Sequence, residues 1–427
     1  MAFIASVRCG LCGLGSFLGC HGEVVMANWQ RACWVVVMLV LDMGNILVVQ
    51  IENSGRASAQ TRANPIDTIA QSPPSYRIAT LAGNGQPGDT PGPVKSARGV
   101  PVDLPFGVAQ GPDGAVYITT VGSHRVLRYD PQSAKLTSVA GSGRRGYAGD
   151  GGLATEAMLN EPYEVRFDSG GNMLIVEMQN HLIRRVAAGS GVITTVAGDG
   201  VAGQRGDGGP ARHARFRYPH SITLDDQDNI YVSDIANHRV RRIDARSGRI
   251  ATVAGNGEPG MPREHGLATA QPILSPQGIA IYAGGLWIAS FRGHVVWRLD
   301  LKTGQIRRVA GTGTQGYSGD GGQPLEATFD GPRGIMMSAT GVLYVVEGEN
   351  NIIRAIDTTR GSICTIAGAG PQRHRYAGDG GAAVDAPLWQ PHGICLLKDG
   401  TLVLSDTKNH RVRRLLPVVP ARPADLD

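Results

Sequence analysis

Six side chains of different chemistry each follow a proline that recurs along the chain. The successive prolines are 57, 57, 57, 56 and 59 residues apart. The residues that follow them are Phe106, Tyr163, His220, Gln277, Arg333 and His392. Two imidazoles, a guanidinium, a phenol and an amide supply the donors and acceptors that orient a small polar ligand. These six residues are the first candidates for a binding site, and the alternative is an exposed position whose side chain is unconstrained.

A second set of side chains recurs with the same period. Each lies three residues before a recurring turn residue, which is Asn in four of the six units (Asn180, Asn237, Asn350 and Asn409). This set reads Thr120, Glu177, Asp234, Ser290, Glu347 and Asp406. A ring of carboxylates can hold a cation or a sugar. However, the same residue type recurs at the same position of the repeat, and this favours a local role. In that role each carboxylate accepts hydrogen bonds from backbone N–H groups of the following turn. The fourth unit departs from the pattern with Phe291 and Arg292, which makes these two residues better candidates for specific contacts.

A repeated unit must position both sets. Segments related to the one that begins at Asn237 (NHRVRRI) also begin at Ser123, Asn180, Gly293, Asn350 and Asn409. Within each period, short apolar runs alternate with a spacing of two and are joined by Gly, Asp and Asn turns, which is the pattern of antiparallel strands. A fixed period of this length indicates one supersecondary unit repeated. Four strands per unit and six units predict an all-β fold, a six-bladed β-propeller with four-stranded antiparallel blades.

The two ends of the repeat region predict how the ring closes. The last unit stops at Leu416 without a fourth strand, and residues 77–83 at the start form a strand that belongs to no unit. We expect this N-terminal strand to join the last blade, because pairing removes two open edges. The first strand of each blade then lines a central channel, with the residues after the prolines around its mouth. Tyr163, Arg333 and Arg292 are expected on an exposed rim.

The units resemble NHL repeats, named for the tripeptide found here at 180–182. Their glycine-rich inserts, of the type A-G-x-G-x-x-G-Y-x-G-D-G-G, are similar to those of teneurins and of bacterial extracytoplasmic NHL proteins. The resemblance covers residues 77–416 and implies the propeller fold. It implies no single activity, because relatives include protein-binding and RNA-binding modules as well as the peptidyl-hydroxyglycine amidating lyase.

The same resemblance raises the question of a metal. His220 and His392 match the positions of zinc-binding histidines in the amidating lyase, but they lie on opposite blades and no third histidine follows a proline. A catalytic zinc takes three protein ligands, so Glu164 or a ring carboxylate would have to complete the set. Asp-Gly-rich inserts can bind calcium, yet each carries one carboxylate and tight turns explain them better. We therefore expect no cofactor, with zinc or calcium as the alternatives.

The ends of the chain differ from the repeats. Residues 1–59 are expected to be an N-terminal extension that contains a signal peptide, since an apolar run at 33–41 precedes the small-residue pattern Ala57-Ser58-Ala59. Residues 60–76 are a linker and residues 417–427 a tail. Cleavage would leave a secreted or periplasmic protein that begins at Gln60 and has no membrane span. An uncleaved anchor is the alternative.

Composition restricts the partner. The net charge is +5 and 18% of the residues are charged, with arginines spread over the repeats, which argues against a nucleic-acid partner. No nucleophile elbow of the Gly-x-Ser-x-Gly type is present. The sequence favours a monomeric, non-catalytic module that binds a protein, glycan or small ligand at the loop-rich face of the channel. The alternative is a metal-dependent lyase or lactone hydrolase with its site at the channel mouth.

Overall fold

The computed structural model describes residues 35–41, 45–51, 57–59, 75–90 and 92–418. The chain divides into two units, residues 1–67 and 68–427. The first unit contains an antiparallel sheet of β1 (Val35–Leu41), β2 (Asn45–Ile51) and β3 (Ala57–Ala59). Most of the expected signal peptide and of the expected linker lies outside the described residues. No helix in the described ranges is long and apolar enough to cross a membrane.

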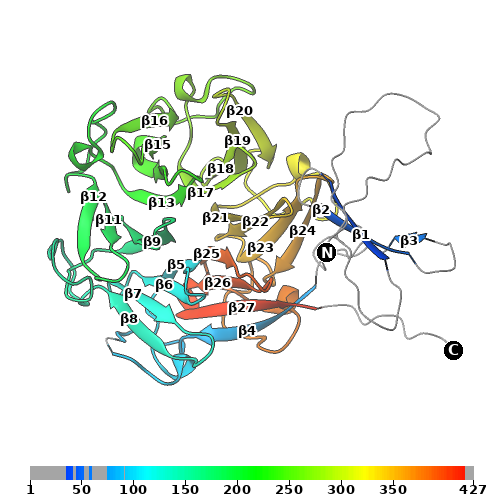
Figure 1. The fold of residues 1–427 in the computed structure, drawn as a ribbon, viewed down its shortest axis with the longest axis horizontal. Coiled ribbons are helices and arrows are strands. Elements are labelled where there is room, and N and C mark those ends of the chain that lie inside the picture. The colour runs from blue at the N-terminus through cyan, green and yellow to red at the C-terminus, as the bar shows by residue number, and fades with distance from the viewer. Residues whose placement is uncertain (1–34, 42–44, 52–56, 60–74, 91, 419–427) are drawn as a thin grey trace, which may run out of the picture. The chain divides into compact units, whose positions relative to one another are not determined.

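The second unit is a ring of six four-stranded antiparallel sheets around a central axis (Figure 1). The innermost strands, which contact one another in succession around the axis, are β5 (Pro105–Gln110), β9 (Pro162–Phe167), β13 (Pro219–Leu224), β17 (Pro276–Tyr282), β21 (Pro332–Met337) and β25 (Pro391–Leu396). The second strands are β6 (Val116–Thr120), β10 (Met173–Glu177), β14 (Ile230–Asp234), β18 (Gly285–Ser290), β22 (Val342–Glu347) and β26 (Leu402–Asp406). The predicted six-bladed propeller is confirmed.

The outer half of each blade completes the sheet. The third strands are β7 (Arg125–Tyr129), β11 (Leu182–Val186), β15 (Arg239–Ile243), β19 (Val295–Asp300), β23 (Ile352–Asp357) and β27 (Arg411–Pro417). The outermost strands are β8 (Leu136–Ala140), β12 (Ile193–Ala197), β16 (Ile250–Ala254), β20 (Ile306–Ala310), β24 (Ser362–Ala367) and β4 (Tyr76–Ala82). Strand β4 pairs with β27, with Leu415 opposite Ile78, so the N-terminal strand closes the last blade as predicted.

Helical structure in the described part is limited to 3₁₀ turns. These are η1 (Ala97–Gly99), η2 (Ala211–His213), η3 (Ile235–Asn237), η4 (Ala268–Ala270), η5 (Pro324–Glu326), η6 (Ala383–Asp385) and η7 (Thr407–Asn409). The segment around Ala154 forms turns and isolated β-bridges. Leu153, which precedes this segment, pairs with Val192 just before the outer strand β12.

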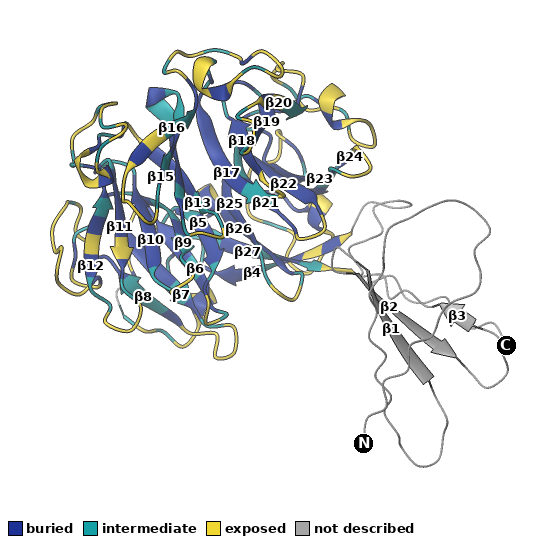
Figure 2. Cartoon of the chain, turned by 45° about the horizontal axis from the view of Figure 1, so that its top comes forward, coloured by how far each residue is buried: buried dark blue, intermediate teal, exposed yellow. Residues whose placement is uncertain are grey.

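The hydrophobic core is divided among the interfaces between blades. Six clusters of buried apolar residues form, and each combines side chains from two consecutive blades. Ile78 and Leu415 of the closing blade, for example, pack with Tyr344 and Ile366 of the blade before it. Burial therefore follows the strands of every blade, while the exposed residues lie mainly in the connections (Figure 2). No blade has a core of its own, so the ring depends on its neighbours throughout.

The glycine-rich inserts protect the outer edges of the blades. Each insert runs beside the outer strand of the blade that it enters, as in the bridges Leu153–Val192, Pro210–Arg249 and Leu267–Gln305. An uncovered outer strand would present unpaired backbone groups to other chains. The sequence interpretation of the inserts as tight turns omitted this edge-covering role.

A histidine joins five of the six blades to the next one. His124, His181, His238, His294 and His410 adopt left-handed backbone conformations, and their Nδ1 atoms accept hydrogen bonds from backbone N–H groups of the following blade. In the fifth blade Asn351 takes this place, and its Oδ1 accepts a bond of 2.8 Å from the Gln390 N–H. The repeated histidines thus have a structural role.

Replacing one of these histidines tests the inter-blade bond. His124→Ala removes the acceptor for the Glu161 N–H and is expected to lower the free energy of unfolding by about 1–2 kcal/mol. His124→Asn is the matched control, because the chain itself uses asparagine here at Asn351 and asparagine tolerates the left-handed conformation. Urea denaturation of the three proteins provides the measurement. Equal losses in the two variants would show that the imidazole acts through packing and not through its acceptor atom.

Candidate functional site

The six residues that follow the recurring prolines come together at one end of the channel. The Phe106 ring lies 4.5 Å from that of Tyr163 and 4.2 Å from that of His392, measured between centroids. Tyr163 in turn contacts His220, at 5.0 Å. His220, Gln277 and His392 are only 5–6% exposed. The structure therefore brings all these side chains into one packed cluster, which we call the mouth cluster: Phe106, Tyr163, His220, Gln277, Arg333 and His392.

The expectation of an exposed rim is wrong for two of its three residues. Arg292 is exposed, but Tyr163 and Arg333 are half-buried. The physical reason is the close approach of the innermost strands. A Cβ atom added to Gly278 would lie 2.2 Å from the Arg333 carbonyl oxygen, and glycine permits this proximity. With so narrow a channel, side chains from opposite blades meet.

His220 and His392 show the effect most clearly, since they belong to opposite blades. Their Nε2 atoms are 3.1 Å apart and their rings stack with centroids 4.8 Å apart. The Gln277 Nε2 lies 2.7 Å from the His220 Nε2. Burial lowers the pKa of His220 to about 3 and holds that of His392 well below its usual value, with Arg333 contributing to both shifts. Both imidazoles are therefore neutral at physiological pH.

The hydrogen bonds of this group leave two polar atoms without partners. When the Gln277 amide donates to the His220 Nε2, the His220 proton resides on Nδ1. That Nδ1 and the Gln277 Oε1 are both buried and find no partner among the described residues. Buried polar atoms without partners are costly, and a bound water or a ligand would satisfy these two.

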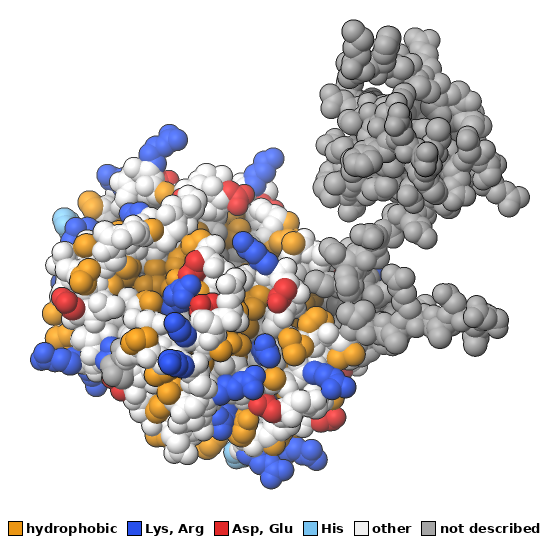
Figure 3. Space-filling view, turned by 60° about the horizontal axis from the view of Figure 1, so that its bottom comes forward, with side chains coloured by type: hydrophobic (Ala, Val, Ile, Leu, Met, Phe, Trp, Pro, Cys, Tyr) orange, Lys and Arg blue, Asp and Glu red, His pale blue; other side chains and the backbone are white. Residues whose placement is uncertain are grey.

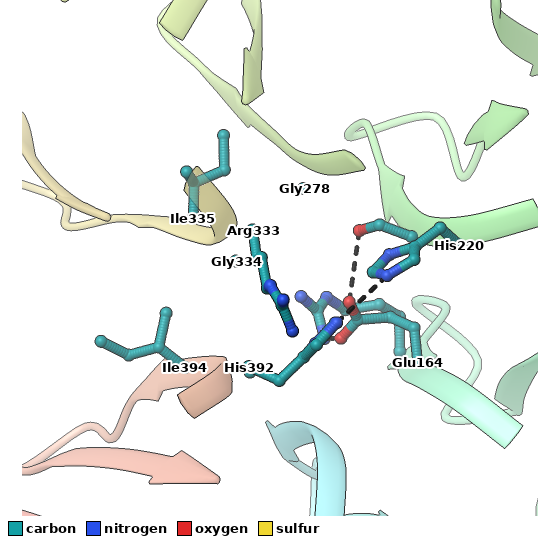
Figure 4. A pocket seen from close by; sticks show the side chains of 11 residues that line it. Glu164, His220, Gly278, Arg333, Gly334, Ile335, His392 and Ile394 are labelled. Atoms are coloured by element: carbon teal, nitrogen blue, oxygen red, sulfur yellow. Dashed lines mark hydrogen bonds and ion pairs between the residues drawn. The ribbon is translucent and has the colours of Figure 1, made fainter. Parts of the chain in front are cut away.

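Beneath the mouth cluster lies a small cavity, which Figure 4 shows from close by. Its volume is about 10 Å³, room for about one water molecule. Glu164 lines it, forms an ion pair with Arg166 and accepts a bond of 3.2 Å from the Ser221 hydroxyl. Burial raises the pKa of Glu164, and Arg166 opposes the shift. An organic ligand does not fit in this cavity.

Arg333 is the cationic member of the mouth cluster. Its guanidinium carbon lies 5.1 Å from the centroid of the Phe291 ring, and it forms an ion pair with Glu349. The sequence analysis singled out Phe291 as a specific contact, and the structure places it against Arg333. Arg292 points to no partner that the structure records among the described residues. Glu349 was not anticipated, because nothing in its spacing distinguishes it from other turn residues.

The four carboxylates of the second set, Glu177, Asp234, Glu347 and Asp406, have a structural role. Glu177 accepts hydrogen bonds from the Asn160 N–H (3.0 Å) and the Asn180 side chain (2.6 Å), and its Oε1 lies 3.3 Å from the Arg184 guanidinium. Both Glu177 and Arg184 are completely buried. Burial raises the pKa of Glu177 to about 7, while Arg184 and these hydrogen bonds oppose the rise. The expected local role is therefore right in kind. The backbone N–H belongs to Asn160, ahead of the blade, and the Asn180 and Arg184 side chains take the place of N–H groups of the following turn.

A buried arginine seven residues after each carboxylate is the signal that sequence reasoning missed. Arg184 also binds Asp150 of the insert, at 2.7 Å. The pairs that share this arrangement are Glu177–Arg184, Asp234–Arg241, Glu347–Arg354 and Asp406–Arg413, with insert residues Asp150, Asp207, Asp320 and Asp379. Where the first and fourth blades carry Thr120 and Ser290, they carry Leu127 and Trp297 instead of arginine. The second-strand carboxylate and the buried arginine of a blade are thus either both present or both absent. The carboxylates of the inserts form ion pairs with these arginines.

The residues fit a zinc site only in part. Two nitrogens 3.1 Å apart can both lie about 2.1 Å from one metal ion, so His220 and His392 are compatible with a shared ion. No group of three or more His, Cys, Asp and Glu side chains that could hold a metal occurs among the described residues. Glu164, the proposed third ligand, is engaged by Arg166 and Ser221. The three-ligand set of a catalytic zinc is therefore incomplete in this arrangement.

Comparisons with known proteins agree with the repeat structure. The NHL repeat model matches residues 216–243 and 388–415. The chain is 27% identical over 314 residues to Protein SUPPRESSOR OF QUENCHING 1, chloroplastic, of Arabidopsis thaliana (71% of this chain, 28% of that protein). It is 29% identical to NHL repeat-containing protein 2 of Gallus gallus (60% and 38%) and 26% identical to Teneurin-1 of Mus musculus (81% and 14%). The chain thus spans well under half the length of these relatives.

Solved structures show the same fold at low sequence identity. An auxiliary nutrient binding protein from Bacteroides ovatus aligns with a TM-score of 0.57 at 14% identity, over 90% of this chain and 89% of that one. A gluconolactonase from Xanthomonas campestris aligns with a TM-score of 0.52 at 12% identity, over 80% and 90%. These likenesses concern the fold alone. The matched repeats, the six closed blades and the relatives together show that the chain contains NHL repeats and folds as a six-bladed β-propeller.

Proposed function

We propose that this chain is a secreted or periplasmic binding module that holds a protein, glycan or small ligand at the loop-rich face of its channel, without catalysis. One observation carries the proposal. Positions with a structural role are reused from blade to blade, as the repeated histidines and the Glu–Arg pairs are. The mouth cluster instead has five different residue types at its six positions, and side chains from all six blades come together there.

Other features support a ligand at this place. The His220 Nδ1 and the Gln277 Oε1 are buried atoms that a ligand or a bound water can satisfy. The neighbours in fold include proteins described as auxiliary nutrient binding proteins. Figure 3 shows basic side chains interspersed with acidic and apolar ones on the face it presents, which does not favour a polyanion such as nucleic acid. The proposed location outside the cytoplasm rests on the small-residue pattern at 57–59 and on the resemblance to extracytoplasmic relatives.

A ligand screen with position-specific variants tests the proposal. The full chain is titrated with free sugars, oligosaccharides, amino acids and short peptides, and hits are measured by calorimetry. Tyr163→Ala alters the mouth cluster, whereas Tyr282→Ala at the far end of an innermost strand is the matched control. We expect a ligand whose affinity falls about tenfold or more in the first variant and stays unchanged in the second. Ligands that bind both variants equally would place binding elsewhere and contradict the proposal.

A metal-dependent activity at the mouth is the second candidate, and the 3.1 Å separation of the His220 and His392 Nε2 atoms favours it. Metal analysis of the dialysed protein, compared with the double variant His220→Ala/His392→Ala, decides the matter. About one equivalent of metal in the wild type and none in the variant would support a lyase or lactone hydrolase. Metal below about a tenth of an equivalent in the wild type would leave a metal-free binding mouth.

A further inference from the structure

The fifth blade differs from the others around Arg333. The residue before the recurring proline is glycine here, at Gly331, and the residue after the second-strand carboxylate is Gly348. The other blades carry side chains at the first of these positions, namely Leu104, Glu161, Tyr218, Ser275 and Gln390. At the second they carry Val121, Met178, Ile235, Phe291 and Thr407. At both positions the fifth blade therefore has space that larger side chains occupy in the other blades.

The space that the glycines leave is filled by the surroundings of Arg333. A Cβ atom on Gly348 would lie 2.5 Å from the Arg333 Nε, and a Cβ atom on Gly331 would lie 2.8 Å from the Phe291 ring and 2.9 Å from the Glu349 Cγ. Arg333, Phe291 and Glu349 therefore could not keep their present positions beside the residues of the other blades. The local sequence fits the arrangement of a guanidinium, an aromatic ring and a carboxylate.

Arg333 is held in an orientation suited to a planar anion. Phe291 covers its guanidinium group, with the carbon 5.1 Å from the ring centroid, and the guanidinium projects toward the centre of the mouth in Figure 4. Its side chain is 15% exposed, and its Nε is buried with no partner among the described residues. A stacked guanidinium with unused donors matches the geometry of a carboxylate, which accepts two parallel hydrogen bonds.

Glu349 occupies part of this anchor from the solvent side. Its carboxylate pairs with the Arg333 Nη2 and remains 36% exposed, so water reaches the pair. Because water reaches the pair from the Glu349 side, solvent screens it, and a ligand carboxylate can displace Glu349 at small cost. Glu349 thus presents to Arg333 the same functional group that an incoming carboxylate would present.

We propose that Arg333 anchors the carboxylate of a small organic monoanion and that Glu349 takes its place when no ligand is bound. This inference rests on the proposed function, because it names the ligand class for the same mouth cluster. A monoanion fits better than a phosphate dianion, since one guanidinium serves the anchor and the acidic residues Glu349 and Glu161 lie at the same rim. Phe106, Tyr163 and Phe291 offer apolar surfaces for the rest of the ligand.

The polar atoms without partners lie next to the anchor. The His220 Nδ1 and the Gln277 Oε1 belong to side chains that are at least nine-tenths buried, and Arg333 is close enough to depress the pKa of His220. A hydroxyl or amide group next to the carboxylate can reach them directly or through the water-sized cavity. The ligand class is therefore a carboxylic acid with a flat or apolar body and a neighbouring polar group.

Benzoate is the probe that tests the anchor, because it combines one carboxylate with a flat ring. Benzamide is the matched neutral compound, and inorganic phosphate represents the competing anion. Binding to the full chain is measured by saturation-transfer NMR and calorimetry, for the wild type and for Arg333→Gln, Glu349→Gln and Arg360→Gln. Arg360 pairs with Asp357 at a distance of 3.2 Å and is 48% exposed, so its variant loses a comparable ion pair at another place.

We expect benzoate to bind and benzamide not to bind. Glu349→Gln removes the internal competitor and should tighten benzoate binding about tenfold, while Arg333→Gln should weaken it at least about tenfold. Arg360→Gln should leave it unchanged. A purely structural ion pair would not give opposite effects for its two partners. Benzoate binding that is unaffected by Arg333→Gln, or is not tightened by Glu349→Gln, overturns the inference.

Two further outcomes separate this inference from the proposed function. Phosphate binding that exceeds benzoate binding would overturn the choice of a carboxylate. A neutral sugar or peptide that binds the wild type, loses affinity in Tyr163→Ala and ignores Arg333→Gln would overturn the anchor and leave the binding mouth in place. Absence of every ligand from the mouth would overturn both. Circular dichroism and thermal midpoints of the variants establish that each remains folded.

Discussion

A chain that begins at Asn84 is expected to lose the folded ring, whereas a chain that begins at Ser75 keeps it. The difference is strand β4, which supplies the outermost strand of the last blade through its pairing with β27. Ile78 is fully buried and Leu81 is 6% exposed, so removal of β4 exposes their partners in two core clusters. Each such side chain contributes about 1.5–3 kcal/mol. The sum, with the lost strand pairing, approaches the whole stability of a typical protein, about 5–15 kcal/mol.

The loss also affects the interactions between the two ends of the repeat region. The Asp379 carboxylate accepts a bond of 3.0 Å from the Thr80 N–H, and Arg411 donates to the carbonyls of Gly83 and Asn84. Soluble yield and thermal midpoint measure the outcome for the two chains. Equal midpoints would show that the ring closes without β4.

Point variants in β4 provide a finer control. Ile78→Ala is expected to destabilise the protein by about 2–5 kcal/mol, because it leaves a cavity between two blades. Arg77→Ala, on the exposed side of the same strand, should change the free energy of unfolding by less than about 0.5 kcal/mol. Similar effects of the two variants would mean that β4 acts through its backbone alone.

Arg184→Leu is expected to be the most damaging single substitution in the second blade. Arg184 is fully buried between Glu177 and Asp150, so its removal leaves the Glu177 carboxylate buried without its cation. Breaking a buried pair from one side costs about 3–5 kcal/mol. The expected result is a loss of that size in the free energy of unfolding, or no folded protein where the starting stability is lower than the loss.

The first blade supplies the matched control for this substitution. It carries Thr120 and Leu127 where the second blade carries Glu177 and Arg184. The double variant Glu177→Thr/Arg184→Leu removes both buried charges together and should be more stable than Arg184→Leu alone, because no uncompensated charge remains. Denaturant unfolding of both variants gives the comparison. A double variant as unstable as the sum of its single variants would show that the two charges do not interact.

Much of the fold follows from local patterns in the sequence. The period of the Asn-His segments gives the number of blades, and the alternation of apolar residues gives four strands in each. The closing strand is also predictable, since an apolar strand without a unit and a unit without its last strand must pair to remove their open edges. The structural role of the repeated histidines follows from their spacing, although their acceptor role across blades does not.

The candidate site, like the fold, could be predicted from the sequence only in part. The sequence identified the mouth cluster, because His220, Arg333 and their counterparts vary where the rest of the repeat is constant. It could not show that His220 and His392 touch. Their separation depends on the width of the channel, which is set by glycines such as Gly278 that let neighbouring strands approach closely. The exposed rim expected from the sequence became a packed cluster for this reason.

By itself, then, the sequence determined the repeated unit, the closed ring and the positions at which chemistry differs between blades, because these depend on interactions between residues close together in the chain or on the repetition itself. Only the tertiary structure decided which side chains meet. The contacts of His220 with His392, of Arg333 with Phe291 and Glu349, and of Arg184 with Glu177 and Asp150 join different blades or distant parts of one blade. The distances between these residues and their burial depend on how all six blades pack around one axis. No pattern of neighbouring residues in the sequence predicts that packing.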